Sequence, residues 1–113
     1  MQLDLTYLES VSGGDSAFIK EILQMFITHT LPDSVILKQH IEESDWTKVS
    51  STAHKMKSSI SMLGDQELMD RILKLEQASR TLTDLEQIPE MFATLEVQLE
   101  RMGRMVTNYI NTK

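Results

Sequence analysis

The chain has 113 residues, enough for one domain with one buried core. Its 11 Lys and Arg residues against 17 Asp and Glu give a net charge of −6, which argues against general binding to nucleic acid or to an anionic membrane. It contains no cysteine, which excludes disulfides and thiolate metal sites, and its apolar runs are too short to span a bilayer. We therefore expect a single cytoplasmic domain over residues 1–113, without a signal peptide.

The first part of the chain predicts a short helix and then a long one. Residues 3–11 carry apolar side chains at every third position, and Gly13 and Gly14 end this amphipathic helix, which we expect to cover one end of the fold. Asp15 is suited to cap the second helix. We expect one long helix with a bend at Pro32; two helices that meet just before this proline are the alternative. The apolar residues of the second pattern are Phe18, Ile19, Ile22, Leu23, Phe26, Ile27, Val35, Ile36, Leu37 and Ile41.

Three more helices are predicted after a turn at residues 42–45. The first extends from Trp46 to Gly64, the second is capped by Asp65, and the third has Pro89 in its first turn. The residues of the three apolar stripes are, in order, Trp46, Val49, Ala53, Met56, Ile60 and Leu63; Leu68, Met69, Ile72, Leu75, Ala78, Ser79 and Leu82; and Phe92, Leu95, Leu99, Met102, Val106 and Tyr109. No segment shows the two-residue alternation of a half-buried strand. The sequence therefore predicts an all-α fold, an antiparallel four-helix bundle with a short N-terminal lid helix.

His54 lies on the polar side of the helix predicted after Trp46. At about 100° per residue, its imidazole projects roughly 140° from the middle of the apolar stripe and should face water. Lys57 follows three residues later and can extend beside the ring, while Ser58 and Ser61 lie one and two turns further along. Such a histidine is by itself most often a solvated surface residue, but a neutral imidazole can also attack phosphorus at cytoplasmic pH.

The sequence around His54 resembles a known family. Residues 53–58 read Ala-His-Lys-Met-Lys-Ser and are followed by Leu-Gly at 63–64, in the same register as the pattern Ala-His-x-Leu-Lys-Gly and a later Leu-Gly in histidine-containing phosphotransfer (HPt) domains. Met56 stands where the family has leucine, and Ser58 stands where it usually has glycine. Residues 4–27 also look like the usual opening of such domains.

The resemblance implies a role in multistep phosphorelays. His54 would accept a phosphoryl group from the aspartyl phosphate of one receiver domain and pass it to the aspartate of another. Lys57 would steady the phosphoryl oxygens, and Lys55 would add a weaker local field. Ser58 and Ser61 would hydrogen-bond the phosphate or leave room for it.

The resemblance also implies the partners. They would be the receiver domains of response regulators and a hybrid sensor histidine kinase, and the magnesium ion would belong to the receiver, so that this chain holds no metal or cofactor. The chain would be a monomer and a covalent substrate of its partners, not an enzyme with turnover. An unphosphorylated helical adaptor that docks signalling proteins remains the alternative. A metal-containing bundle enzyme is disfavoured because no histidine has a glutamate three residues before it.

Overall fold

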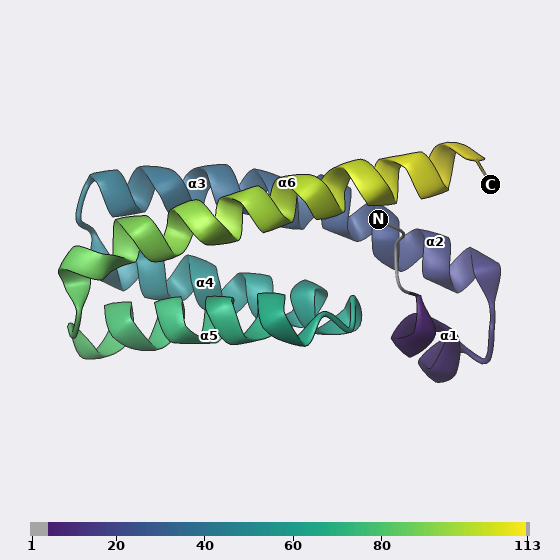
Figure 1. Ribbon diagram of the computed structural model, residues 1–113, viewed down its shortest axis with the longest axis horizontal. Coiled ribbons are helices and arrows are strands. Elements are labelled where there is room, and N and C mark those ends of the chain that lie inside the picture. The colour runs from purple at the N-terminus through teal and green to yellow at the C-terminus, as the bar shows by residue number, and fades with distance from the viewer. Residues whose placement is uncertain (1–4, 113) are drawn as a thin grey trace.

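The computed structural model describes residues 5–112, which form helices joined by short connections (Figure 1). The helices are α1 (Thr6–Ser12), α2 (Ser16–Met25), α3 (Leu31–Glu42), α4 (Trp46–Met62), α5 (Gln66–Thr81) and α6 (Ile88–Thr112), with a π-helical turn at Phe26–Thr30 and a 3-10 turn at Leu85–Gln87. Successive long helices run antiparallel, and no strand occurs in the described part of the chain (Figure 1). The predicted all-α bundle of four long helices with a short N-terminal helix is confirmed.

The first long helix is continuous, as expected, because the π-helical turn joins α2 to α3. Pro32 has no N–H group and cannot donate the hydrogen bond that an α-helix requires at its position. Just before it, the N–H of Leu31 donates to the carbonyl of Phe26, five residues back, which is the π-helical pattern. Figure 1 shows α2 and α3 inclined to one another on either side of this turn. The chain therefore accommodates the proline without leaving the helical conformation.

Aspartates begin three of the helices. Asp15 accepts hydrogen bonds from the first turn of α2, Asp45 accepts one from the N–H of Lys48, and Asp65 accepts one from the N–H of Leu68. These side chains satisfy backbone donors that have no partner inside a helix. The short connections after α3 and α4 leave each new helix antiparallel to the one before it (Figure 1).

α1 covers the end of the bundle at which α4 finishes. It begins at Thr6, and the start predicted at Leu3 lies outside the described residues. Leu8 is buried, and Tyr7 lies against Gly64, where an added Cβ atom would come within 2.6 Å of the Cβ of Tyr7. Gly64 also has a φ of +72°, which glycine adopts without steric cost. The conformation and the contact both require glycine at this position.

The buried core follows the predicted stripes with several corrections. Its largest fully buried side chains are Phe26, Leu8, Leu23, Leu37, Met56, Ile60, Leu68, Ile72, Leu75, Ile88, Leu95 and Leu99. Val11, Phe18, Val35 and Ile36 are exposed instead, because each lies off the face that its helix turns towards the core. Leu82, predicted in the stripe of α5, is exposed because the helix ends at Thr81 and the backbone turns at Leu82.

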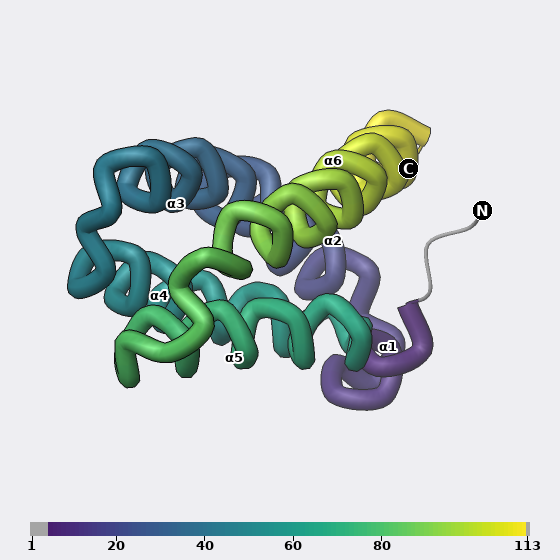
Figure 2. Tube along the Cα trace, turned by 60° about the vertical axis from the view of Figure 1, so that its left-hand side comes forward, coloured from purple at the N-terminus to yellow at the C-terminus, as the bar shows by residue number. Residues whose placement is uncertain are grey.

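α4 packs mainly against α5 and α3, and it lies diagonally across the bundle from α6 (Figure 2). One side of α4 is therefore buried, and its outward side lies at a corner between two neighbouring helices.

Candidate functional site

α4 presents His54 to solvent. Ala53 and Met56, which flank it in the apolar stripe, are buried in the core, and they fix the rotation of the helix about its axis. The side chain of His54 is 72% exposed, as the stripe predicted. Its imidazole makes a hydrogen bond through the Nδ1 atom.

The Nδ1 atom of His54 lies 2.8 Å from Oε2 of Glu76, which projects from α5. The carboxylate is only 5% exposed, so it is a fixed acceptor inside the bundle rather than a mobile surface group. An ionised carboxylate can only accept a hydrogen bond, which places the proton of a neutral imidazole on Nδ1. The lone pair of the ring is then on Nε2, the nitrogen that does not contact Glu76.

Two cations also approach the carboxylate of Glu76. Nζ of Lys57 donates to Oε1 at 3.0 Å, and Nη1 of Arg80 lies 4.0 Å from the same oxygen. Lys57 is largely shielded by the α4–α5 interface, whereas Arg80 is mostly exposed. His54 and Lys57 therefore share one buried acceptor and are held side by side.

The ionisation of Glu76 follows from these contacts. Burial alone raises the pKa of its carboxyl group, but hydrogen bonds from Lys57 and His54, together with the charges of these two groups, outweigh burial. The net result is a pKa below the ordinary glutamate value, so the carboxylate is ionised at neutral pH. This keeps Glu76 in the form that accepts both hydrogen bonds.

The other predicted site residues are not brought to the carboxylate. Nζ of Lys55 points to α3 and pairs with the buried Asp33 at 3.3 Å. The hydroxyl of Ser61 donates to the carbonyl of Ser58 at 2.7 Å, which is a local bond within α4. Ser58 itself is exposed one turn beyond His54 and lines a small hollow between α2 and α4.

Glu76 and Arg80 are site residues that the sequence interpretation missed. A signal was present for Glu76, because it lies four residues after Ile72 and three before Ser79, within the stripe that faces the bundle. A charged residue in such a stripe is buried only when it has partners. The two residues that hydrogen-bond to it come from α4, about twenty positions earlier in the chain, and no local pattern links the two helices.

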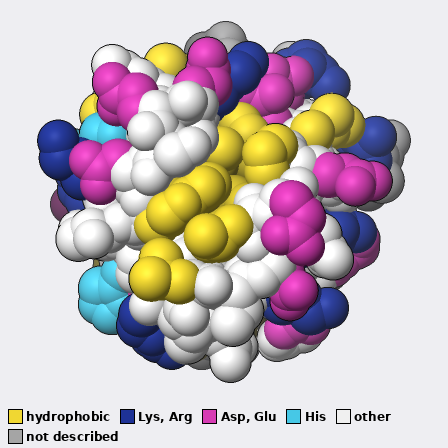
Figure 3. All heavy atoms as spheres, turned by 90° about the vertical axis from the view of Figure 1, so that its left-hand side faces the viewer, with side chains coloured by type: hydrophobic (Ala, Val, Ile, Leu, Met, Phe, Trp, Pro, Cys, Tyr) yellow, Lys and Arg dark blue, Asp and Glu magenta, His cyan; other side chains and the backbone are white. Residues whose placement is uncertain are grey.

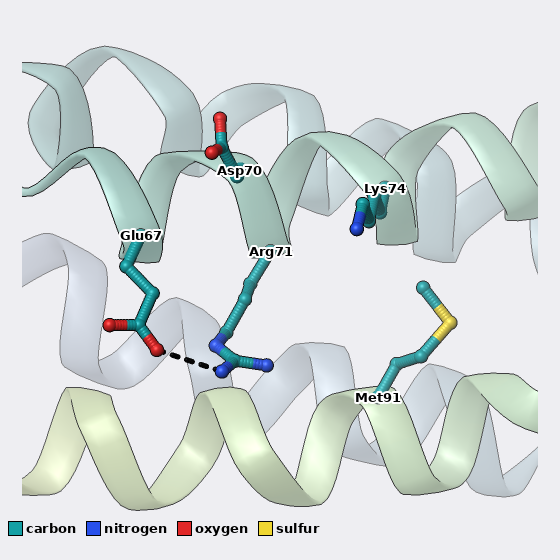
Figure 4. Close-up of a pocket in the computed structure, with 5 residues that line it drawn as sticks. All are labelled: Glu67, Asp70, Arg71, Lys74 and Met91. Carbon is teal, nitrogen blue, oxygen red and sulfur yellow. Dashed lines mark hydrogen bonds and ion pairs between the residues drawn. The ribbon is translucent and has the colours of Figure 1, made fainter.

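A separate hollow between α5 and α6 contains none of these residues. It is lined by Glu67, Asp70, Arg71, Lys74 and Met91, and Figure 4 shows Arg71 extending towards α6. The guanidinium group of Arg71 donates to Glu67 at 2.8 Å, and this hydrogen bond is the main reason that the pKa of Glu67 is lowered.

Within residues 5–112, no group of three or more His, Asp or Glu side chains is arranged to hold a metal ion. In the same part of the chain, no helix has both the length and the apolar character needed to cross a membrane.

An exposed imidazole with an oriented Nε2 atom and a neighbouring ammonium group is suited to accept a phosphoryl group. The comparison with known families agrees with this chemistry, because the family model of the Hpt domain matches residues 21–105. The matched region includes α4 and α5, which carry His54, Lys57 and Glu76. No curated protein and no solved structure gave a significant match to the chain.

Proposed function

The chain belongs to the Hpt domain family, and from this membership we propose that His54 is the phosphorylated residue of a phosphorelay carrier. Hpt domains take part in phosphotransfer between components of two-component signalling systems. In this proposal His54 receives the phosphoryl group from the aspartyl phosphate of one receiver domain and delivers it to the aspartate of another.

The observation that carries the proposal is the hydrogen bond between His54 and Glu76. The carboxylate fixes the direction of the ring and holds the proton on Nδ1, which leaves Nε2 as the nucleophile. Because the ring is already oriented by a buried group, little rotational freedom is lost when a partner docks.

The transfer can be written as a balanced step. The lone pair of Nε2 attacks the phosphorus atom, a nitrogen–phosphorus bond forms, and the bond from phosphorus to the aspartyl oxygen breaks to release the aspartate carboxylate. The proton stays on Nδ1, where Glu76 stabilises the positive charge of the phosphorylated ring. In the second transfer the imidazole leaves as a neutral ring, so neither step requires a proton from solvent.

Lys57 is proposed to stabilise the phosphoryl oxygens. Its ammonium group donates a hydrogen bond to Glu76, and Lys57 lies beside His54 on the next turn of α4. Arg80 is exposed at the same carboxylate and adds a second positive charge near the ring. Lys55 is proposed to contribute only a weak field because Asp33 pairs with it. Ser58 and Ser61 are proposed to leave space for the phosphate.

The remaining part of the reaction is assigned to the partners. A receiver domain would contribute the aspartate and the magnesium ion, and a hybrid sensor histidine kinase would supply the phosphoryl group to the relay. No cofactor is therefore proposed on this chain. We propose that the chain acts as a cytoplasmic monomer and as a covalent substrate of these partners. His54 is exposed on the outward side of α4, which suits contact first with a donor and then with an acceptor.

The decisive experiment follows a labelled phosphoryl group from a phosphorylated receiver domain to this chain. The wild type should acquire label that is lost in acid and retained in alkali, as expected for a phosphohistidine. His54→Gln should acquire none, while the control His29→Gln, which alters another exposed histidine, should be labelled like the wild type. Label retained by His54→Gln rejects His54 as the acceptor, and absence of label on every protein favours the adaptor function.

A further inference from the structure

The end of the bundle away from α1 exposes a group of apolar side chains. This end is formed by the connection between α3 and α4 and by the connection between α5 and α6 (Figure 1). Leu82 is 63% exposed, and Trp46 and Leu85 are partly exposed at the edge of the core. Figure 3 shows hydrophobic side chains gathered at the centre of this end, with both acidic and basic side chains around them. We call Trp46, Leu82 and Leu85 the end patch.

The backbone at the end patch is held in an unfavourable conformation. Leu82 has a φ of +57°, although it follows the last residue of α5, where glycine or asparagine is preferred. Ser44 and Asp84 also have positive φ, and these are the only such non-glycine residues in the described part of the chain. All three belong to the connections that build this end. A leucine kept exposed in a strained conformation indicates that its side chain has a use.

The charge around the end patch restricts what can bind there. Segments 42–48 and 82–90 contain one basic residue, Lys48, which pairs with the neighbouring Asp45 at 3.7 Å. Their acidic residues are Glu42, Glu43, Asp45, Asp84, Glu86 and Glu90. A second copy of this chain would bring the same two acidic segments against these, which opposes self-association through this face. A partner with basic residues around an apolar centre would be attracted.

We propose that the end patch docks a basic amphipathic segment of another protein, with apolar side chains on Leu82, Trp46 and Leu85 and with Lys or Arg residues on the acidic side chains of segments 42–48 and 82–90. Trp46 precedes His54 by eight residues, which is about 12 Å along a helix. The docked segment therefore leaves the exposed imidazole free. This inference rests on the shape and charge of the end patch and does not depend on phosphorylation of His54.

The test uses two short helical peptides with leucines along one face, one with flanking lysines and one with glutamines in place of the lysines. We expect the lysine peptide to bind at least about tenfold more tightly at low salt, and to lose most of this advantage at high salt. Backbone amide shifts in NMR spectra should change at segments 42–48 and 82–90. Equal affinity for both peptides, or shifts located elsewhere, would overturn the proposal.

Leu82→Gly separates docking from a structural role. Glycine relieves the positive φ and removes the side chain, so the variant should be as stable as the wild type or more stable, while its affinity for the lysine peptide falls several-fold. Val97→Asn is the matched control, since it removes another exposed apolar side chain, 55% exposed and more than two turns into α6, and should bind like the wild type. Unchanged affinity of Leu82→Gly contradicts the proposal, as does an equal loss in Val97→Asn.

Discussion

The exposed His54 donates a hydrogen bond from Nδ1 to the buried carboxylate of Glu76, over 2.8 Å. This contact joins the exposed imidazole, which another protein can reach, to a carboxylate that is buried and held in place inside the bundle. The carboxylate is in turn held by Lys57 and approached by Arg80, so its charge is balanced within the α4–α5 interface.

Replacing Glu76 should slow phosphotransfer more than it disturbs the fold. Glu76→Gln keeps an oxygen acceptor but removes the charge, and we expect transfer to fall by about tenfold because the ring and Lys57 are less well oriented. Glu76→Ala should slow transfer further and lower the free energy of unfolding by about 1–3 kcal/mol. Label transfer from a phosphorylated receiver measures the rate, and Glu67→Gln, on the exposed side of α5, is the control. A wild-type rate in Glu76→Ala would show that this carboxylate does not position His54.

Glu76 should also make stability depend on pH in acid. Because the pKa of Glu76 is lower in the folded chain than in the unfolded chain, its contribution is complete above the unfolded value of about 4.3 and is lost as the pH falls through the lowered folded value. Urea unfolding from pH 6 down to about pH 3 should therefore show a steeper loss of stability in the wild type than in Glu76→Gln. Parallel curves for the two proteins would contradict the lowered pKa.

Lys57 and Lys55 form a matched pair for testing the electrostatic role. Lys57→Ala should reduce the transfer rate on the order of tenfold to a hundredfold, because it removes a cation beside the phosphoryl group and loosens Glu76. Lys55→Ala removes the same charge two residues away but only breaks the pair with Asp33, and its rate should change little. The two rates should be measured with the same phosphorylated receiver at several salt concentrations. Equal effects would assign the role to net charge and not to position.

The sequence predicts the bundle well because helix periodicity and capping are local. The aspartates at positions 15 and 65 begin helices as expected, and the buried stripe of α4 places His54 outside. The exposure of Val35 and Ile36 was not foreseen, since both lie beside the truly buried Leu37 and a run of apolar residues does not indicate which of them faces the core.

The part of the site that the sequence does not reveal depends on contacts between helices. His54 and Glu76 are brought together by the register of α4 against α5, which depends on how the buried side chains of both helices interlock. The π-helical turn at Phe26–Thr30 is similar, because the proline predicts a disturbance but not how the backbone accommodates it. These features require the packed structure.

Ser58→Gly tests the position at which this chain departs from the family pattern. The side chain is exposed one turn beyond His54, so its removal should leave transfer equal or faster by widening access to the ring. Glycine within α4 should lower the free energy of unfolding by about 0.5 kcal/mol. Transfer rates and chemical denaturation of the two proteins give both quantities. Slower transfer would mean that the hydroxyl group takes part.

Gly64→Ala should loosen α1 without affecting the phosphorylation site. The new Cβ atom would lie 2.6 Å from the Cβ of Tyr7, which is too close for two carbon atoms that are not bonded. A φ of +72° strains alanine as well. We expect the free energy of unfolding to fall by about 2 kcal/mol or more and the amide hydrogens of α1 to exchange faster, because α1 must move away from α4. Transfer to His54 should persist, since Gly64 follows His54 by ten residues, almost three helical turns further along the chain.

Gly13→Ala isolates the contact from the strain. Gly13 has a similar φ of +67°, but nothing lies within 4 Å of an added Cβ atom. Its alanine variant should lose only the conformational part, about 1 kcal/mol, and the excess loss in Gly64→Ala then measures the displacement of Tyr7. Equal losses of unfolding free energy in the two variants would mean that α1 moves aside at no cost. The packing of α1 on the end of α4 would then contribute nothing to stability.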